Sequence, residues 1–159
     1  MSQSNLVSTT PACLHGVETI KEDNPNVTGP EHDEPYPLYT PGVYEARCVR
    51  ARVYRHPCFR AWKCELRYVL ISSGKSVTGF FHLGTGDKPI PARGSKYRRA
   101  WIIASGEKPR KRQKMSHTMF LGKIFEVRID DTTRTWDQRE HLAAERYSTV
   151  KDILTKKWP

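Results

Sequence analysis

One stretch, residues 41–54, limits the possible folds most: Pro-Gly-Val-Tyr-Glu-Ala-Arg-Cys-Val-Arg-Ala-Arg-Val-Tyr. Its valines, tyrosines and alternating polarity predict a long β-strand. The alternation slips once, which leaves two sets of inward-phase residues out of step: Tyr44, Ala46 and Cys48, then Val49, Ala51 and Val53. Both sets point inward only if an extra residue, a β-bulge, sits near Cys48 and Val49 and bends the strand. A bent strand can pair in two directions and help to close a small barrel.

The outward face of this strand is rich in arginine. Four arginines lie within nine residues, from Arg47 to Arg55. Such a face has two interpretations, a solvated surface or a groove for a polyanion, and this stretch alone leaves both open.

Charge is divided unevenly along the chain. The net charge is +10, but residues 1–40 hold six acids and one base, so the remainder carries +15. A body this basic favours nucleic acid or another anionic surface as its partner. The first forty residues are polar and rich in proline, which predicts a disordered acidic arm. The arm is either a solubilising tail or a segment that lies, through residues 31–34, against the basic body.

Targeting and cysteine patterns indicate a cytoplasmic protein without a membrane segment. No run is long enough to span a bilayer, and the first residues lack the features of a signal peptide. The four cysteines form no C-x-x-C pair, so we expect reduced thiols, no metal and no cofactor. Cys48 and Cys64 fall on the apolar phase of their strands and are expected in the core.

Alternation and capping signals predict four more strands and one helix. The expected strands are 61–71, 76–83, 123–129 and 144–149. The expected helix, 96–105, begins after the cap Ser95 and stops at Gly106. A capped helical turn is expected at 116–122, and a second one near the end of the chain from Val150, Ile153 and Leu154.

This order of elements favours an OB-fold. Three meandering strands, a helix and a two-stranded return match that five-stranded barrel, although other small barrels share the meander. We therefore expect a mainly β fold: an OB-fold-like barrel over 41–159, with a helix between strands three and four, behind a disordered arm over 1–40.

Parts of the sequence resemble small proteins encoded by phages and conjugative elements, some of which are OB-fold single-stranded-DNA-binding proteins. The resemblance lies in Pro-Gly-Val-Tyr-Glu at 41–45, the alternating second strand, Phe-Leu-Gly-Lys-Ile-Phe-Glu-Val-Arg-Ile at 120–129, and Arg-Tyr-Ser at 146–148. It spans residues 41–154 and implies an OB-fold and a role in replication or recombination of the element. It carries over no catalytic residue. Such proteins often end in an acidic tail that recruits partners, whereas this chain ends in bases.

A single-stranded-DNA site, with RNA as a possible ligand, needs a basic groove along the phosphates and aromatic platforms under the bases. The basic candidates are Arg47, Arg50, Arg52, Arg55, Lys63, Arg67, Lys96, Arg98, Arg99, Arg110, Lys111, Arg112 and Lys114. The stacking candidates are Tyr54, Phe59 and Phe80. Phe80 and Phe81 are neighbours on a strand and must face opposite sides, and Phe80 takes the outer phase. Gly79, beside them, indicates a bend or a close backbone approach.

Two other function classes compete with this one. The first is a metal-dependent nuclease that uses scattered acids of the body: Asp87, Asp130, Asp131 and Asp137. The second is a protein-binding regulator encoded by a mobile element. No Ser-His-Asp order, Walker loop or H-E-x-x-H motif occurs in the sequence. We therefore expect a binding protein and no enzyme.

Overall fold

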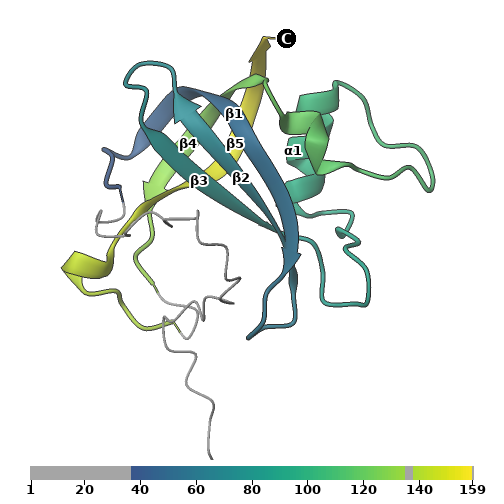
Figure 1. The fold of residues 1–159 in the computed structure, drawn as a ribbon, viewed down its shortest axis with the longest axis horizontal. Helices are drawn as coiled ribbons and strands as arrows, with labels where there is room; N and C mark the ends of the chain where they lie inside the picture. The colour runs from purple at the N-terminus through teal and green to yellow at the C-terminus, as the bar shows by residue number, and fades with distance from the viewer. Residues whose placement is uncertain (1–36, 135–137, 159) are drawn as a thin grey trace, which may run out of the picture. The chain divides into compact units, whose positions relative to one another are not determined.

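The computed structural model describes residues 37–134 and 138–158. Five strands in this part of the chain pair in the order β1-β2-β3-β5-β4, and β4 returns to β1, so the sheet closes in a ring (Figure 1). The strands are β1 (Gly42–Arg55), β2 (Trp62–Leu70), β3 (Ser76–His82), β4 (Ile124–Asp131) and β5 (Ser148–Trp158). The described helices are α1 (Lys96–Ser105) and the short 3-10 helices η1 (His117–Phe120) and η2 (Ala143–Glu145). A mainly β fold with one α-helix between β3 and β4 is as the sequence predicted.

The strand β1 serves two neighbours. Its first part pairs with β4 up to Arg47, and its second part pairs with β2 from Ala46 to Arg55. The register with β2 shifts between Cys48 and Arg50, which confirms the predicted bulge. The expectation that Val49 points inward is wrong, because Val49 is the bulged residue and is 48% exposed.

The core fills the inside of the ring and follows the predicted alternation. Its buried strand residues include Cys64, Leu66, Tyr68 and Leu70 of β2, Phe81 of β3, and Phe125, Val127 and Ile129 of β4. The helix α1 adds its buried face, formed by Tyr97, Ala100, Trp101 and Ala104. The Ser95 side chain accepts a hydrogen bond from the Arg98 backbone N–H, and Gly106 ends the helix at φ 82°. The predicted helix, its two caps and its buried face are therefore confirmed.

The ring closes between β3 and β5 at one parallel pair, Gly79 and Val150. A Cβ atom on Gly79 would lie 3.1 Å from the Val150 Cβ, closer than such atoms normally approach. The absence of a side chain lets the two backbones meet, which confirms the close approach predicted at this glycine.

The C-terminal strand differs from the prediction. The expected strand at 144–149 and the helical turn after it are both wrong, since β5 begins at Ser148 and η2 precedes it. The pairing of β5 with β4 contains three register irregularities. These irregularities bring Val150 and Ile153, three residues apart, to the buried side together. Apolar residues three apart in the sequence are also typical of a helix, which explains the wrong prediction.

Residues 37–40, which the sequence assigned to the arm, are tied to the sheet. The Pro37 carbonyl accepts a hydrogen bond of 2.9 Å from the Ser148 N–H. The Tyr39 N–H donates to the Ser148 Oγ at 2.8 Å, and the Tyr39 hydroxyl donates to the Ser76 carbonyl at 2.7 Å. The rest of the predicted arm, residues 1–36, lies outside the described residues.

Candidate nucleic-acid interface

Outward side chains of β1, β2 and β3 form three rows across the sheet. The register gives the rows Arg50–Arg67–Thr78, Arg52–Glu65–Phe80 and Tyr54–Lys63–His82. We call these nine residues the β1–β2–β3 face. It unites six of the predicted site residues: Arg50, Arg52, Tyr54, Lys63, Arg67 and Phe80. Arg47 lies in the next row, opposite Val69 of β2.

The charges on this face are only partly paired. The Arg52 guanidinium donates to the Glu65 carboxylate through Nη2 at 2.6 Å and Nε at 3.0 Å. Arg50 and Arg67 stand directly opposite each other, and among the described residues neither forms an ion pair. Like charges in directly opposed positions destabilise a sheet unless a counter-charge binds them. The face therefore offers two unneutralised guanidinium groups to an anion.

The first part of β1 contains a second like-charge pair, and this one is neutralised within the protein. Glu45 and Glu126 also stand directly opposite each other, across β1 and β4. The Lys157 ammonium lies 3.8 Å from the Glu45 carboxylate and 3.2 Å from that of Glu126. The protein thus supplies its own counter-ion for the acidic pair, which the arginine pair lacks.

Two aromatic side chains lie among these charges. Phe80 is 43% exposed on β3, in the same row as the Arg52–Glu65 pair, whereas Phe81 is buried. The predicted assignment of Phe80 to the outside is therefore confirmed. The Arg52 guanidinium carbon lies 5.0 Å from the centre of the Tyr54 ring, within cation–π range. Burial raises the pKa of Tyr54, with a smaller contribution from the carboxylate of Glu65, so the phenol is neutral at pH 7.

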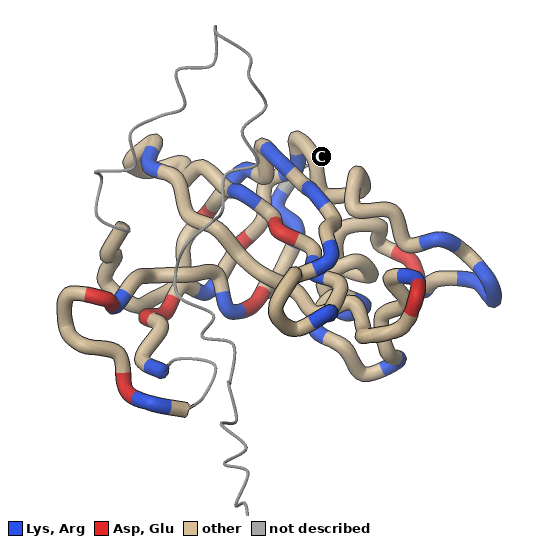
Figure 2. Tube along the Cα trace, turned by 60° about the horizontal axis from the view of Figure 1, so that its bottom comes forward, with Lys and Arg blue, Asp and Glu red and all other residues tan. Residues whose placement is uncertain are grey.

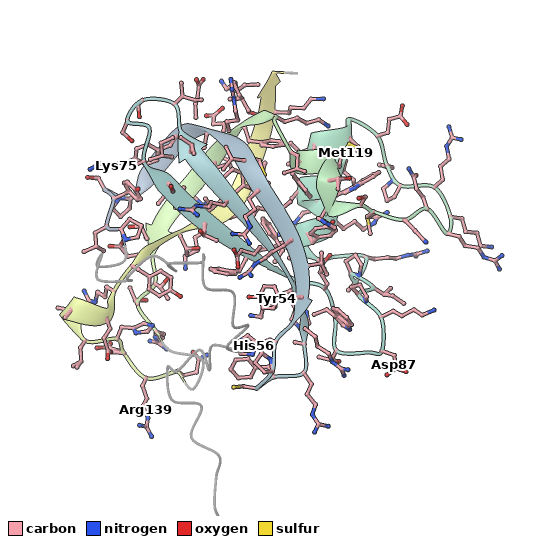
Figure 3. The ribbon with its side chains drawn as sticks, viewed as in Figure 1. Tyr54, His56, Lys75, Asp87, Met119 and Arg139 are labelled. Atoms are coloured by element: carbon pink, nitrogen blue, oxygen red, sulfur yellow. The ribbon has the colours of Figure 1, made fainter. Side chains whose placement is uncertain are left out.

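The turn after β1 extends the aromatic surface. Figure 3 shows Tyr54 and His56 at the end of β1 that enters this turn. The rings of His56 and Phe59 are 4.6 Å apart, and Phe59, a predicted stacking residue, is 39% exposed. Burial lowers the pKa of His56, and Lys63 lowers it further. His56 is therefore mainly neutral at pH 7, like the aromatic rings beside it.

The β4–β5 connection supplies aromatic residues that sequence reasoning missed. Tyr147 lies close enough to Tyr54 to contribute electrostatically to the raised pKa of Tyr54. The rings of Tyr147 and His141 are 6.2 Å apart in an edge-to-face arrangement. No local signal could have found these two, since only the folded ring brings this connection to β1. Thr78 and His82 were also missed, although the alternation that identified Phe80 indicates both.

Arg55 does not join the face. It continues the inward phase of Ala51 and Val53 beyond the core. Its guanidinium lies 6.0 Å from the Trp62 ring centre, and its Nε donates to the Arg60 carbonyl at 3.3 Å. Of the arginine cluster in β1, this member is directed away from the others.

The remaining basic candidates also lie elsewhere. Lys96 of α1 forms an ion pair of 3.6 Å with Asp152 of β5, and Arg98 donates to the Arg93 carbonyl at 3.5 Å. Arg99 is exposed on the same helix. The four predicted site residues in the loop after α1 are exposed, and that loop projects away from the sheet (Figures 1 and 2). They are Arg110, Lys111, Arg112 and Lys114. Apart from Arg47 and Arg55 of β1, the structure thus separates the predicted basic residues into a sheet face, a helix and a projecting loop.

The cysteines and acids of the described residues include two buried free thiols and no group that could hold a metal ion. Cys48 and Cys64 are buried in the core with free thiols, as predicted, and burial raises the pKa of each to about 12. Cys58 is disulfide-bonded, so the expectation of reduced thiols is wrong for this residue. No group of three His, Cys, Asp or Glu side chains within residues 37–134 and 138–158 is arranged to hold a metal ion. The Asp131 carboxylate accepts a hydrogen bond from Ser148 at 2.7 Å. Asp137, part of the nuclease hypothesis, lies outside the described residues.

Comparison of the chain with models of known protein families and with curated proteins gives no match. No helix in the described part of the chain has both the length and the apolar character needed to cross a membrane.

Proposed function

We propose that the chain is an OB-fold protein that binds single-stranded DNA on its β1–β2–β3 face and has no catalytic activity of its own. Three features support the OB-fold: the strand order, the parallel contact between β3 and β5, and the helix between β3 and β4. In that fold, ligands lie across the second and third strands, between the loops that follow strands one and four. Here those loops carry the His56–Phe59 and His141–Tyr147 ring pairs.

The observation that carries the proposal is the unneutralised pair Arg50–Arg67. The opposing carboxylates of Glu45 and Glu126 receive a lysine, whereas the opposing guanidinium groups receive no acid among the described residues. A phosphate between Arg50 and Arg67 would remove their repulsion and accept hydrogen bonds from both. A repulsive pair kept on an exposed face is thus explained by a ligand that carries the missing negative charge.

The aromatic rings favour a single strand over a duplex. Phe80 and Tyr54 lie one row apart on the face. Base faces are free to stack on such rings in a single strand, whereas in a duplex they are stacked on one another. Stacking is tolerant of sequence, so we expect weak base preference. A role in replication or recombination of a phage or mobile element is part of the proposal, and its support is the sequence resemblance alone.

The decisive experiment titrates the protein with labelled single-stranded and blunt duplex oligonucleotides of equal length at several salt concentrations. We expect tighter binding to the single strand and a fall in log affinity with log salt of about 0.7 for each phosphate bound. Equal or tighter binding to the duplex would contradict the single-strand assignment. Incubation of the same oligonucleotides with magnesium or manganese tests for cleavage, which the proposal excludes.

A matched pair of double variants locates the site. Arg50→Ala with Arg67→Ala removes two charges from the face and should weaken binding and flatten the salt slope by about 0.7 for each phosphate that is no longer bound. It should leave thermal stability unchanged or higher, because it removes a repulsion. Lys111→Ala with Arg112→Ala removes two charges from the projecting loop and should affect binding less. A larger effect from the loop pair would move the site away from the sheet.

A further inference from the structure

A second surface feature lies between α1, β4 and β5, apart from the β1–β2–β3 face. It is a cleft of about 560 Å³, within the size range of ligand pockets. Its apolar lining includes Phe81, Ile103 and Leu154, of which Leu154 is 38% exposed. Its charged lining includes Lys96, Arg99 and Arg128.

The strand topology leaves an open strand edge at this cleft. β5 meets β3 only at Val150, and from Asp152 onward it pairs with β4 alone. The Lys151 carbonyl accepts a hydrogen bond of 3.4 Å from the Lys96 ammonium. After Lys151, the edge of β5 that faces away from β4 has no backbone hydrogen-bond partner in the described part of the chain. Asp152 and Leu154 of this segment line the cleft. An unpaired strand edge is a template for an added strand.

The charges around the cleft are ordered and mostly positive. Asp152 accepts a hydrogen bond from Arg128 and lies 3.6 Å from the Lys96 ammonium, so both cations contact this carboxylate. Arg99 forms no ion pair with any described residue. Three cations against one carboxylate leave an excess of positive charge beside an apolar floor.

We propose that this cleft binds an extended acidic peptide of a partner protein, which adds as a strand to the free edge of β5. Apolar side chains of the peptide contact Phe81, Ile103 and Leu154 of the cleft, and its carboxylates meet Arg99 and Lys96, which line the same cleft. Nucleic acid fits these features less well, because its backbone carries no alternating N–H and carbonyl groups for a strand edge. The site goes beyond the proposed function and would connect a DNA-binding face to a second protein.

The test uses the full chain and a fluorescein-labelled peptide composed of leucine and aspartate. Fluorescence anisotropy should show saturable binding, and Arg99→Glu should weaken it about tenfold, the loss expected when one favourable charge interaction becomes repulsive. Arg110→Glu makes the same charge change in the projecting loop and should change affinity by about twofold at most. Equal losses in the two variants would overturn the proposal, because net charge alone would then hold the peptide.

Two altered peptides examine the apolar floor and the strand edge. Replacing the leucines with serine should weaken binding, and N-methylation of alternate backbone amides should abolish it. An N-methylated peptide that binds as tightly as the parent overturns strand addition.

The remaining controls keep the two proposals separable. Thermal melting of Arg99→Glu establishes that it is folded, and Arg99→Gln replaces it if it is not. Unlabelled single-stranded oligonucleotide should leave the peptide bound. If the oligonucleotide displaces the peptide, and Arg99→Glu also binds the oligonucleotide more weakly, the cleft is a site for nucleic acid. Oligonucleotide titration of the Arg50 and Arg67 variants tests the proposed function independently of the peptide experiments, so one proposal can fail without the other.

Discussion

Phe80 and Phe81 are adjacent residues with opposite surroundings, and they separate binding from folding at the scale of single residues. Phe80 is 43% exposed beside the charges of the face, whereas Phe81 is 2% exposed in the core. Phe80→Ala should cost about 1–3 kcal/mol of binding free energy and leave the salt slope nearly intact, because stacking involves no phosphate. Phe81→Ala should cost about 3–5 kcal/mol of folding stability. Thermal melts and oligonucleotide titrations of both variants measure this, and unchanged binding by Phe80→Ala would remove Phe80 from the site.

A buried hydroxyl gives a second prediction at this scale. The Tyr68 hydroxyl lies in the core without a hydrogen-bond partner among the described residues, and burial raises the pKa of Tyr68 well above its usual value. The Tyr97 hydroxyl, by contrast, donates to the Met115 carbonyl at 2.8 Å. Tyr68→Phe should leave the free energy of unfolding unchanged or higher by about 1 kcal/mol, and Tyr97→Phe should lower it by about 1 kcal/mol. Urea unfolding of the two variants compares them directly, and a large loss in Tyr68→Phe would reveal a partner for its hydroxyl.

Single elements differ in how far the sequence predicts them. The helix α1 was predicted to the residue, because Ser95, Gly106 and the apolar spacing between them are local signals. The bulge at Cys48–Arg50 was predictable for the same reason, since the break in alternation lies within one strand. The strand β5 was not, because its irregular register is set by pairing with β4, which local sequence does not encode.

The closure of the ring between β3 and β5 depends on Gly79 of β3. A Cβ on Gly79 would lie 3.1 Å from the Val150 Cβ and 3.4 Å from the Val150 carbonyl oxygen. Gly79→Val should therefore lower the free energy of unfolding by about 1–3 kcal/mol, although valine otherwise suits a strand. Gly86→Val is the control, because a Cβ at Gly86 meets nothing within 4 Å. Chemical denaturation of both variants tests this, and equal stability of the two would show that the junction between β3 and β5 can widen without cost.

At the scale of the whole molecule, the order of residues in the sequence does not show which side chains become neighbours in the candidate site. The predicted basic residues were expected to act together because the chain after residue 40 carries +15, yet the bases that share a face with Phe80 are Arg50, Arg52, Lys63 and Arg67. Lys96 lies on α1, where it pairs with Asp152, and the loop after α1 projects away from the sheet (Figure 2). Alternation along a strand predicts which way a side chain points, whereas the pairing of strands decides which side chains become neighbours.

The charge division along the chain leads to the last prediction, at the scale of the molecule. Residues 1–36 contain six acids and one base, so their removal raises the net charge from +10 to +15. A tethered acidic segment competes with phosphates for a basic surface through electrostatics that salt screens over about 10 Å at 0.1 M. Deleting residues 1–36, while keeping the Tyr39 hydrogen bonds with Ser148 and Ser76, should strengthen oligonucleotide binding at low salt and have little effect at high salt. A variant with all six acids changed to their amides should reproduce the effect if charge is its cause. Equal affinities of the full and shortened chains at low salt would mean that the acidic segment does not compete for the face.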